Sequence, residues 1–238
     1  MTSSCACAAC SLAAVGALGL TTQASAEELP RTVGGIKLPD TTLCKEATAL
    51  AKAVMPKPLF NHSVRTYVFG ATWGARANRA FDEETLYLAS VLHDLGLVDP
   101  YIKDARFELD GADAARTFLT GKSYPKDKVD LIWEAIAMHS TLEIPERMRP
   151  EVALVHVGVF MDGGRHADKF PATFYTDVFA ALPRMGNKRQ IAESVAEVIR
   201  RKPHTASLAF QVDIAKKLVP GFNPPSYMDV KPPFPFDQ

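Results

Sequence analysis

The segment Pro150–Asp162 (PEVALVHVGVFMD) is apolar on almost every side after its first turn. A helix of this composition has no polar face to turn toward water, so other parts of the chain must surround it. Gly163 and Gly164 follow the segment and predict where this helix ends. The chain therefore has to fold around a central buried helix.

The remaining segments favour helices as the surrounding elements. Apolar residues recur at helical spacing in Thr41–Met55 and Phe60–Ala77. Asp82 is a candidate N-cap for a helix that runs to about Leu95, before Gly96. Further helices are predicted at Asp110–Leu119, Pro125–His139, Asp177–Leu182, Gln190–Arg200 and Thr205–Leu218. No alternating strand pattern of useful length is present, so we expect a single all-α helical bundle without an internal linker.

Residues 1–26 differ from the rest of the chain because they contain no charged residue. An apolar run at Ser11–Leu20 precedes Ala24-Ser25-Ala26, which is a pattern typical of a signal peptide and its cleavage site. A positively charged start is missing from this segment. We therefore expect either an exported protein, periplasmic or secreted, or a cytoplasmic protein with a leader.

The positions of the cysteines and prolines also separate the two ends of the chain from its middle. Cys5, Cys7 and Cys10 lie in the leader, so cleavage would leave Cys44 alone and no intrachain disulfide is expected. Residues 220–238 contain six prolines, which predicts an irregular C-terminal tail. The folded domain is therefore expected to span residues 27–219.

The charge balance excludes some classes of partner. Lys and Arg together number 27, as do Asp and Glu, so the formal net charge is zero. Binding to a phosphate backbone depends on a basic surface, so no nucleic-acid partner is expected. No apolar run after residue 30 reaches the roughly 20 residues of a membrane helix, so we expect no membrane span in the mature chain. Assembly into a homo-oligomer stays open.

Four ionisable residues lie in apolar or helix-terminal surroundings. His93 and Asp94 are adjacent in LYLASVLHDLGL, His62 lies near the start of the preceding helix, and Asp162 ends the most apolar helix. Buried carboxylates are costly unless they are paired or bind a metal. Two imidazoles and two carboxylates suit one divalent cation. Taken singly, each residue has a plainer interpretation, such as a hydrogen-bonded core histidine or a turn-forming aspartate.

The order His…His-Asp…Asp at these spacings resembles the HD domain superfamily of metal-dependent hydrolases. The resemblance covers roughly residues 45–215 and implies an all-α HD domain with metal ligands at His62, His93, Asp94 and Asp162. Within this superfamily, the chain most resembles cyanamide hydratase-like HD proteins. Six segments carry this resemblance: NHSVRTYVFG (61–70), LYLASVLHDLGL (86–97), RFELDGADAARTFL (106–119), WEAIAMHST (133–141), ALVHVGVFMDGG (153–164) and KPHTAS (202–207). The residues at 109–110 and 139–141 depart from the hydratase pattern, which affects the substrate more than the metal.

The resemblance implies that the chain hydrates a small neutral nitrile such as cyanamide, giving urea, through a metal-bound hydroxide. It implies one divalent transition metal, with zinc first and iron or manganese as alternatives. The candidate catalytic residues are His139 as a proton donor, Asp94 as the holder of a water, and Glu108 as a group that orients water or the substrate amine. A small apolar pocket is expected, and core packing is the favoured interpretation for most of its candidate wall aromatics: Phe60, Phe69, Trp73, Trp133 and Phe160.

Two other functions fit the same domain. HD-type phosphohydrolases act on nucleotides or phosphomonoesters and often carry a lysine soon after His-Asp, whereas this chain has none before Lys103. Phosphate sites also depend on clustered cations, and no such motif is present. A metal-binding domain without catalysis is the third possibility. His139 also leaves open a second metal, although one metal is favoured.

Overall fold

A computed structural model of the chain describes Met1, residues 29–206 and residues 210–224. The expected leader after Met1, with Cys5, Cys7 and Cys10, and the tail beyond Pro224 lie outside the described residues. The described part contains a short hairpin, β1 (Thr32–Val33) and β2 (Ile36–Lys37), and nine α-helices. The helices are α1 (Thr42–Val54), α2 (Lys57–Arg76), α3 (Glu83–Leu92), α4 (Phe107–Gly121), α5 (Lys126–Met138), α6 (Pro150–Asp162), α7 (Ala172–Ala181), α8 (Asn187–Arg201) and α9 (Gln211–Leu218). Four short 3-10 turns join them: η1 (Leu95–Leu97), η2 (Pro145–Arg147), η3 (Ala167–Lys169) and η4 (Pro203–Ala206).

The all-α prediction is confirmed, and the largest errors lie at helix starts. The last predicted helix was placed from Thr205, but Thr205 lies in η4 and α9 begins at Gln211, and the helix predicted from Asp177 begins at Ala172 as α7. Likewise, α4 begins at Phe107 rather than Asp110, because Asp110 accepts hydrogen bonds from the backbone amides of Lys103 and Ala105 and so fixes the preceding loop against the first turn.

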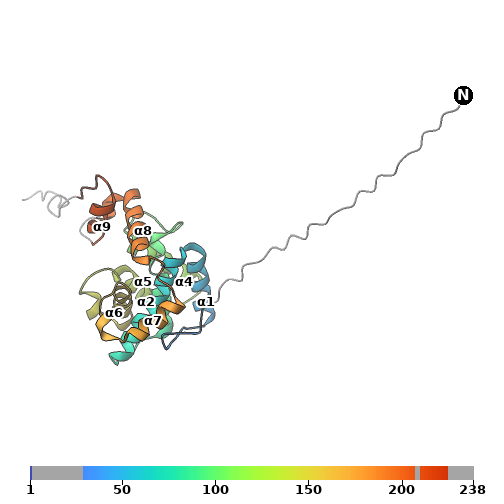
Figure 1. Cartoon of the computed structure of the whole chain (residues 1–238), viewed down its shortest axis with the longest axis vertical. Coiled ribbons are helices and arrows are strands. Elements are labelled where there is room, and N and C mark those ends of the chain that lie inside the picture. Colours follow the sequence, from blue (N-terminus) through green and yellow to red (C-terminus); the bar gives the residue numbers. More distant parts are fainter. Residues whose placement is uncertain (2–28, 207–209, 225–238) are drawn as a thin grey trace, which may run out of the picture.

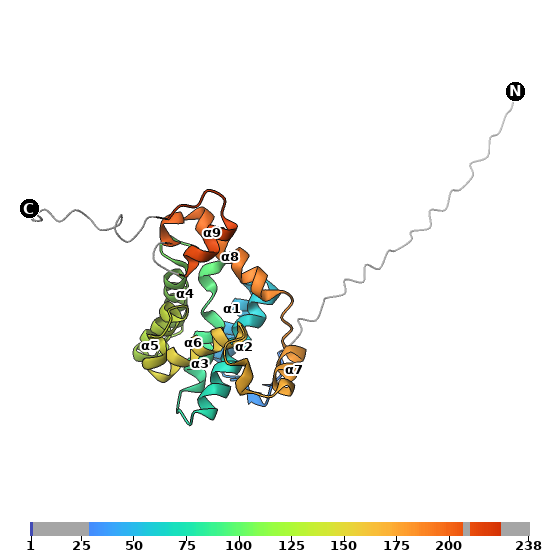
Figure 2. The ribbon, with the colours of Figure 1, turned by 60° about the vertical axis from the view of Figure 1, so that its left-hand side comes forward.

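Helices α2 and α6 lie side by side in the centre of the molecule (Figures 1 and 2). A Cβ added at Gly158 of α6 would lie 2.1 Å from the carbonyl oxygen of Thr66 in α2. A Cβ at Gly70 of α2 would lie 2.5 Å from the carbonyl oxygen of Leu154. Both positions therefore need glycine, because the two helix backbones approach more closely than any side chain allows.

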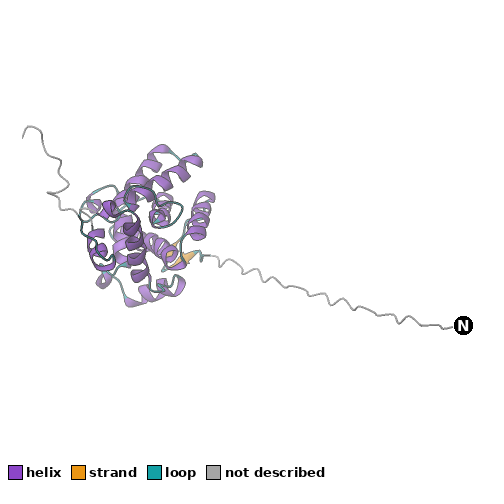
Figure 3. Ribbon diagram, turned by 90° about the horizontal axis from the view of Figure 1, so that it is seen from above, coloured by secondary structure: helices purple, strands orange, loops and turns teal. Residues whose placement is uncertain are grey.

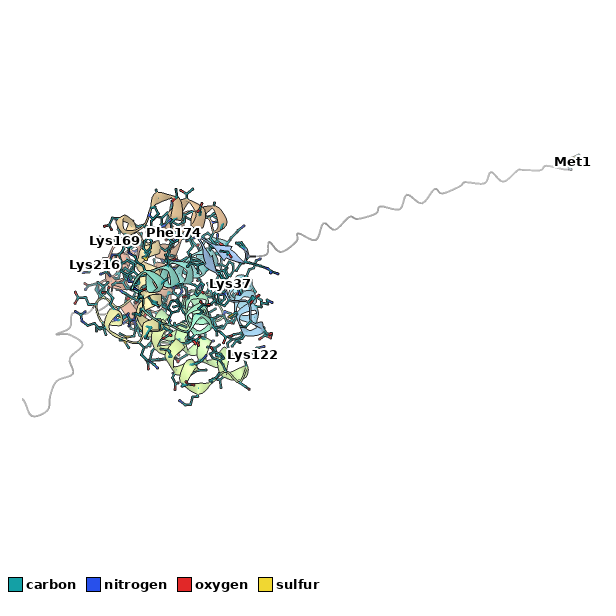
Figure 4. All side chains as sticks on the ribbon, turned by 90° about the horizontal axis from the view of Figure 1, so that it is seen from below. Met1, Lys37, Lys122, Lys169, Phe174 and Lys216 are labelled. Carbon is teal, nitrogen blue, oxygen red and sulfur yellow. The ribbon has the colours of Figure 1, made fainter. Side chains whose placement is uncertain are left out.

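The other helices enclose this central pair. Figure 2 shows α8 and α9 at one end of the molecule, beyond α4 and α2, and Figure 3 shows the strand pair at the margin of an otherwise helical body. The side chains of Lys37, Lys122 and Lys216 are exposed at the periphery, as labelled in Figure 4. Among the described residues, no helix is long and apolar enough to cross a membrane.

The turn after α3 is packed backbone to backbone against α4. Helix α3 ends at Leu92, His93 is its C-cap, and Asp94 precedes η1. A Cβ at Gly96 would lie 2.0 Å from the carbonyl oxygen of Phe107, and one at Gly111 would lie 3.0 Å from that of His93. The glycine predicted to stop the helix is therefore needed for this close approach, which fixes the His-Asp pair relative to α4.

Replacing Gly158 by alanine tests the close approach of α2 and α6. The added methyl group forces the two backbones apart, so Gly158→Ala should lower the free energy of unfolding by about 3 kcal/mol. For a domain of this size that corresponds to a fall of roughly 6–12 °C in Tm. Thermal unfolding followed by circular dichroism measures the change.

Gly121→Ala is the matched control, because a Cβ at this helical position meets nothing within 4 Å. Alanine favours a helix over glycine by up to about 1 kcal/mol, so this variant should unfold at the same temperature or slightly higher. Equal stability of Gly158→Ala and Gly121→Ala would contradict the packing described for α2 and α6.

Candidate metal centre

Three buried imidazoles are oriented by hydrogen bonds through their Nδ1 atoms. His93 Nδ1 lies 2.7 Å from the carbonyl oxygen of Ser90, and His139 Nδ1 lies 2.6 Å from that of Ile136. His62 Nδ1 lies 2.6 Å from a carboxylate oxygen of Asp162. A carbonyl or carboxylate oxygen can only accept, so each Nδ1 carries the hydrogen and each neutral ring keeps a lone pair on Nε2.

All three Nε2 atoms lie near the carboxylate of Asp94. The Oδ2 atom of Asp94 lies 3.1 Å from His93 Nε2 and 3.7 Å from His62 Nε2. Its Oδ1 atom lies 3.9 Å from His139 Nε2. His93 and Asp94 come from the end of α3, whereas His62 comes from α2 and His139 from the end of α5. The fold thus joins three elements at one point.

Two of these atoms are buried and have no hydrogen-bond partner in the part of the chain that the structure describes. They are His93 Nε2 and Asp94 Oδ2, and both residues are almost fully buried. A lone pair and a carboxylate oxygen repel each other in a dry site, unless a proton or a cation lies between them. Although burial lowers the pKa of His93, the charge of Asp94 raises it above its ordinary value. Burial opposes ionisation of Asp94, and the charge of His93 lowers its pKa nevertheless.

These donors fit a divalent transition metal. His62, His93 and Asp94 each offer one ligand atom, and the three atoms lie within 4.8 Å of one another. Imidazole and carboxylate ligands suit zinc, iron and manganese. The hydrogen bond from His62 Nδ1 to Asp162 is the kind of outer contact that orients a metal-binding histidine.

Asp162 lies behind His62 and is saturated with donors. Arg65 Nε and Nη2 donate to its two oxygens at 2.8 and 2.9 Å, and Asn187 Nδ2 donates at 2.8 Å. Arg184 also donates to its backbone carbonyl at 2.7 Å. Burial opposes ionisation, but His62 and Arg65 hold the pKa of Asp162 well below its usual range. Its predicted role as a fourth ligand stays a prediction, since these contacts place it in the layer outside the three-atom group.

Glu108 occupies a comparable position behind Ser140. Its carboxylate accepts hydrogen bonds from Ser140, from Gln211 and from Arg106, whose Nη2 lies 2.9 Å away. It does not line the cavity beside the histidines, whereas Ser140 does. The contacts of Glu108 are those of a positioning residue, and its predicted catalytic role stays a prediction.

Of the three remaining histidines, one contacts the site from behind and two lie away from the cavity. His156 Nδ1 donates to the backbone carbonyl of His139 at 2.9 Å, so this buried ring supports the site from outside. His166 stacks on Trp73 with ring centroids 4.6 Å apart. His204 is exposed and lies 3.2 Å from the carbonyl oxygen of Asp104. Neither of the last two lines the cavity.

A cavity of about 290 Å³ opens beside the three imidazoles and Asp94. Its polar lining includes Asp162, Ser140, Asn187, Arg184 and Lys188. Its apolar lining consists of Phe107, Leu142, Val159, Phe160, Ile191, Val195 and Phe210. The cavity thus has a polar end at the histidines and a largely apolar remainder.

Four of the five candidate wall aromatics do not line the cavity, in agreement with the core packing favoured for most of them. Phe60 and Phe69 are core residues, Trp73 stacks on His166, and Trp133 donates a hydrogen bond to Asp113. Only Phe160 of that set lines the cavity. Apolar residues on a buried helix have many packing partners, so their spacing does not reveal which of them face a cavity.

Three residues beside the histidines or in the cavity lining were not predicted from the sequence. Arg65 is fully buried and binds Asp162, and its spacing of three residues from His62 on one helix was the available signal. Asn187 is 2% exposed, and its Oδ1 has no hydrogen-bond partner among the described residues. Phe210 comes from the poorly patterned start of α9, where the sequence offers no comparable signal.

Comparison with known families agrees with this geometry. Residues 59–161 match the HD domain family. The match begins in α2, just before His62, and ends in α6, just before Asp162, so it covers the central helices and includes His62, His93 and Asp94. No curated protein shows significant sequence similarity to the chain.

Removing a ligand tests the metal centre. The purified chain should contain about one divalent transition metal ion, and His93→Ala or Asp94→Ala should lose most of it because an incomplete ligand set binds weakly. Elemental analysis of the purified variants gives the metal content directly.

His204→Ala is the control, because this exposed histidine lies outside the cavity. It should keep the full metal content. Full occupancy in both His93→Ala and Asp94→Ala, with circular dichroism spectra like that of the wild type, would place the metal elsewhere or exclude it.

Proposed function

We propose that the chain is a metal-dependent hydratase that adds water across the triple bond of a neutral nitrile, with cyanamide the first substrate to test. The observation that carries this proposal is the apolar wall of the cavity beside the His–Asp cluster. A neutral substrate needs an apolar wall, a metal and a group that moves one proton. Zinc is the first metal to test, because His and Asp side chains supply the ligands.

A phosphomonoester fits this cavity less well. Phosphate sites gather several cationic side chains around the dianion. Among the described residues that line the cavity, the lysines and arginines are Arg184 and Lys188. Arg184 already donates to the backbone carbonyl of Asp162 at 2.7 Å. A phosphate dianion would therefore meet few cations and two carboxylates.

When bound, a divalent metal lowers the pKa of water and polarises a carbon–nitrogen triple bond. His62, His93 and Asp94 would hold it, with Asp162 orienting His62. The net reaction forms a carbon–oxygen double bond, reduces the carbon–nitrogen triple bond to a single bond and moves both water protons to the nitrile nitrogen, the first during addition and the second from the hydroxyl of the isourea, so that cyanamide and water give urea. The buried walls exclude bulk water from the reacting atoms.

His139 is the residue that would move the proton. Its Nδ1 hydrogen is fixed on the carbonyl of Ile136, so Nε2 has a lone pair near Asp94. Burial, and then the charge of His93, lower the pKa of His139 to about 4, so the ring is neutral at pH 7. His139 therefore accepts the water proton first and returns it to nitrogen, rather than starting as an acid.

Asn187 offers a second substrate contact. Its Nδ2 donates to Asp162, which leaves Oδ1 as a buried acceptor on a residue that lines the cavity. A buried acceptor without a partner is costly, and the N–H of a cyanamide or urea amine would satisfy it.

Substrate turnover distinguishes the two enzyme classes. The metal-loaded chain should release urea from cyanamide, and little phosphate from a nucleoside monophosphate or a generic phosphomonoester. A chelator should abolish urea release, and zinc, iron or manganese should restore it. Phosphate release that requires the metal, without urea formation, would replace the hydratase by an HD-type phosphohydrolase.

Replacing His139 tests its proposed role. His139→Ala should lower kcat by roughly 10²–10⁴-fold, the usual contribution of a positioned acid–base group, while metal content stays unchanged. His166→Ala should leave kcat unchanged, since this ring stacks on Trp73 outside the cavity. Loss of metal from His139→Ala would instead make His139 a ligand.

A further inference from the structure

Aromatic rings form a continuous wall from the metal centre to the mouth of the cavity. The rings of His93 and His139 have centroids 4.8 Å apart, and Phe107 lies edge-on to His139 at 5.5 Å. Phe210 follows, edge-on to Phe107 at 6.5 Å. His93, His139, Phe107 and Phe210 all line the cavity, and Phe160 also lines it from α6. A flat apolar group would contact ring faces and edges along this wall.

The mouth of the cavity is bordered by apolar side chains that remain exposed. Leu142 is 56% exposed and Phe210 is 41% exposed, and both line the cavity. Exposure of large apolar side chains to water is unfavourable, and apolar groups that are exposed together commonly mark a binding site. These two side chains would be covered by a ligand that extends from the metal centre to the mouth.

Phe210 is held at the mouth by its neighbour. Gln211 is 2% exposed, and its side-chain amide donates a hydrogen bond to Glu108. Glu108 in turn accepts from Ser140, which lines the cavity. The buried contact between α9 and α4 therefore fixes Phe210 in place, so the aromatic border belongs to the built site.

The cavity is also large for cyanamide. Its volume of about 290 Å³ compares with the ~30 Å³ that one water molecule occupies in the liquid. Cyanamide is a short linear molecule that would reach from the metal centre over only a small part of the wall. Most of the apolar surface, including Leu142 and Phe210, would then stay without a contact.

We infer that this site takes a neutral ligand with a ring-sized apolar body, whose reacting polar group lies at the histidines and whose ring lies against Phe107, Phe160 and Phe210. The identity of the reacting group rests on the proposed hydratase function. The size and apolar character of the body rest on the cavity alone. Phenylcyanamide, which carries a ring on the cyanamide nitrogen, represents this class, and phenylurea is its hydration product.

Direct binding to the metal-loaded full chain tests the inference without turnover. Calorimetry should give a Kd for phenylurea at least roughly tenfold lower than that for urea, because the ring is buried against the wall. Leu142→Ala and Phe210→Ala should each weaken phenylurea binding by about three- to tenfold and leave urea binding unchanged. Leu142 lies in an exposed loop, so its variant stays informative if Phe210→Ala unfolds.

Ile144→Ala is the matched control, because Ile144 is 55% exposed and close in sequence to Leu142 but does not line the cavity. It should not change phenylurea binding. Equal affinity for urea and phenylurea, or equal loss in Ile144→Ala, would overturn the inference. So would a change of oligomeric state in Phe210→Ala, measured by analytical ultracentrifugation, without a change in phenylurea affinity, since the border would then join two copies of the chain.

Turnover separates this inference from the proposed function. If phenylurea binds as expected and neither cyanamide nor phenylcyanamide is hydrated, the hydratase proposal fails and the ring-sized ligand stands. If cyanamide is hydrated while phenylcyanamide and phenylurea are excluded, the hydratase stands and the ring-sized ligand is wrong.

Discussion

The carboxylate of Asp162 is the interaction on which the rest of the site depends. It lies at the end of α6 and binds His62 and Arg65, which are three residues apart on α2, and Asn187 at the start of α8. Each carboxylate oxygen accepts from the Arg65 fork, a geometry that makes a charge pair strong as well as directional. Without Arg65, the buried charge of Asp162 would keep only the longer 3.4 Å contact with Arg184 as a full countercharge, and weakening a buried ion pair in this way is costly. This ion pair therefore fixes the ring of His62 and joins three helices at the metal centre.

The helices could be predicted to a large extent, and the reason is physical. Helix α6 is apolar all round, so its burial followed from its sequence, and its bounds agree with the predicted Pro150–Asp162. Helix α2 is buried just as deeply from Leu59 to Ala71, although it carries Asn61 and Arg65. Those polar residues hide the burial of α2 from a pattern of apolar spacing. They are tolerated there because Asp162 and the backbone carbonyl of Pro183 satisfy their hydrogen bonds.

The site was predictable where chemistry restricts the residue type. A buried His-Asp pair is stable in few environments, so the sequence indicated a site at His93 and Asp94. In the structure, one ligand atom of His62 lies within 4.8 Å of a ligand atom of each. The layer around them was not predictable, because serine, asparagine and arginine are ordinary surface residues elsewhere in the chain. Glu108 is a residue whose contacts could not be predicted although its position was singled out. Its sequence neighbourhood indicated importance, but only the fold reveals that Ser140, Gln211 and Arg106 surround it.

The imidazoles of the metal centre are fixed at their outer nitrogens, whereas two atoms at its middle lack a hydrogen-bond partner among the described residues. Ser90, Ile136 and Asp162 fix three Nδ1 atoms, and close backbone contacts at Gly96 and Gly111 prevent the His-Asp turn from moving away. His93 Nε2 and Asp94 Oδ2 are left facing each other, and an unsatisfied buried polar group costs about 1–3 kcal/mol. A cation between these two atoms would turn this repulsion into attraction. The raised pKa of His93 has the same origin, since burial opposes a charge on the ring and the charge of Asp94 still favours a proton where the cation would lie.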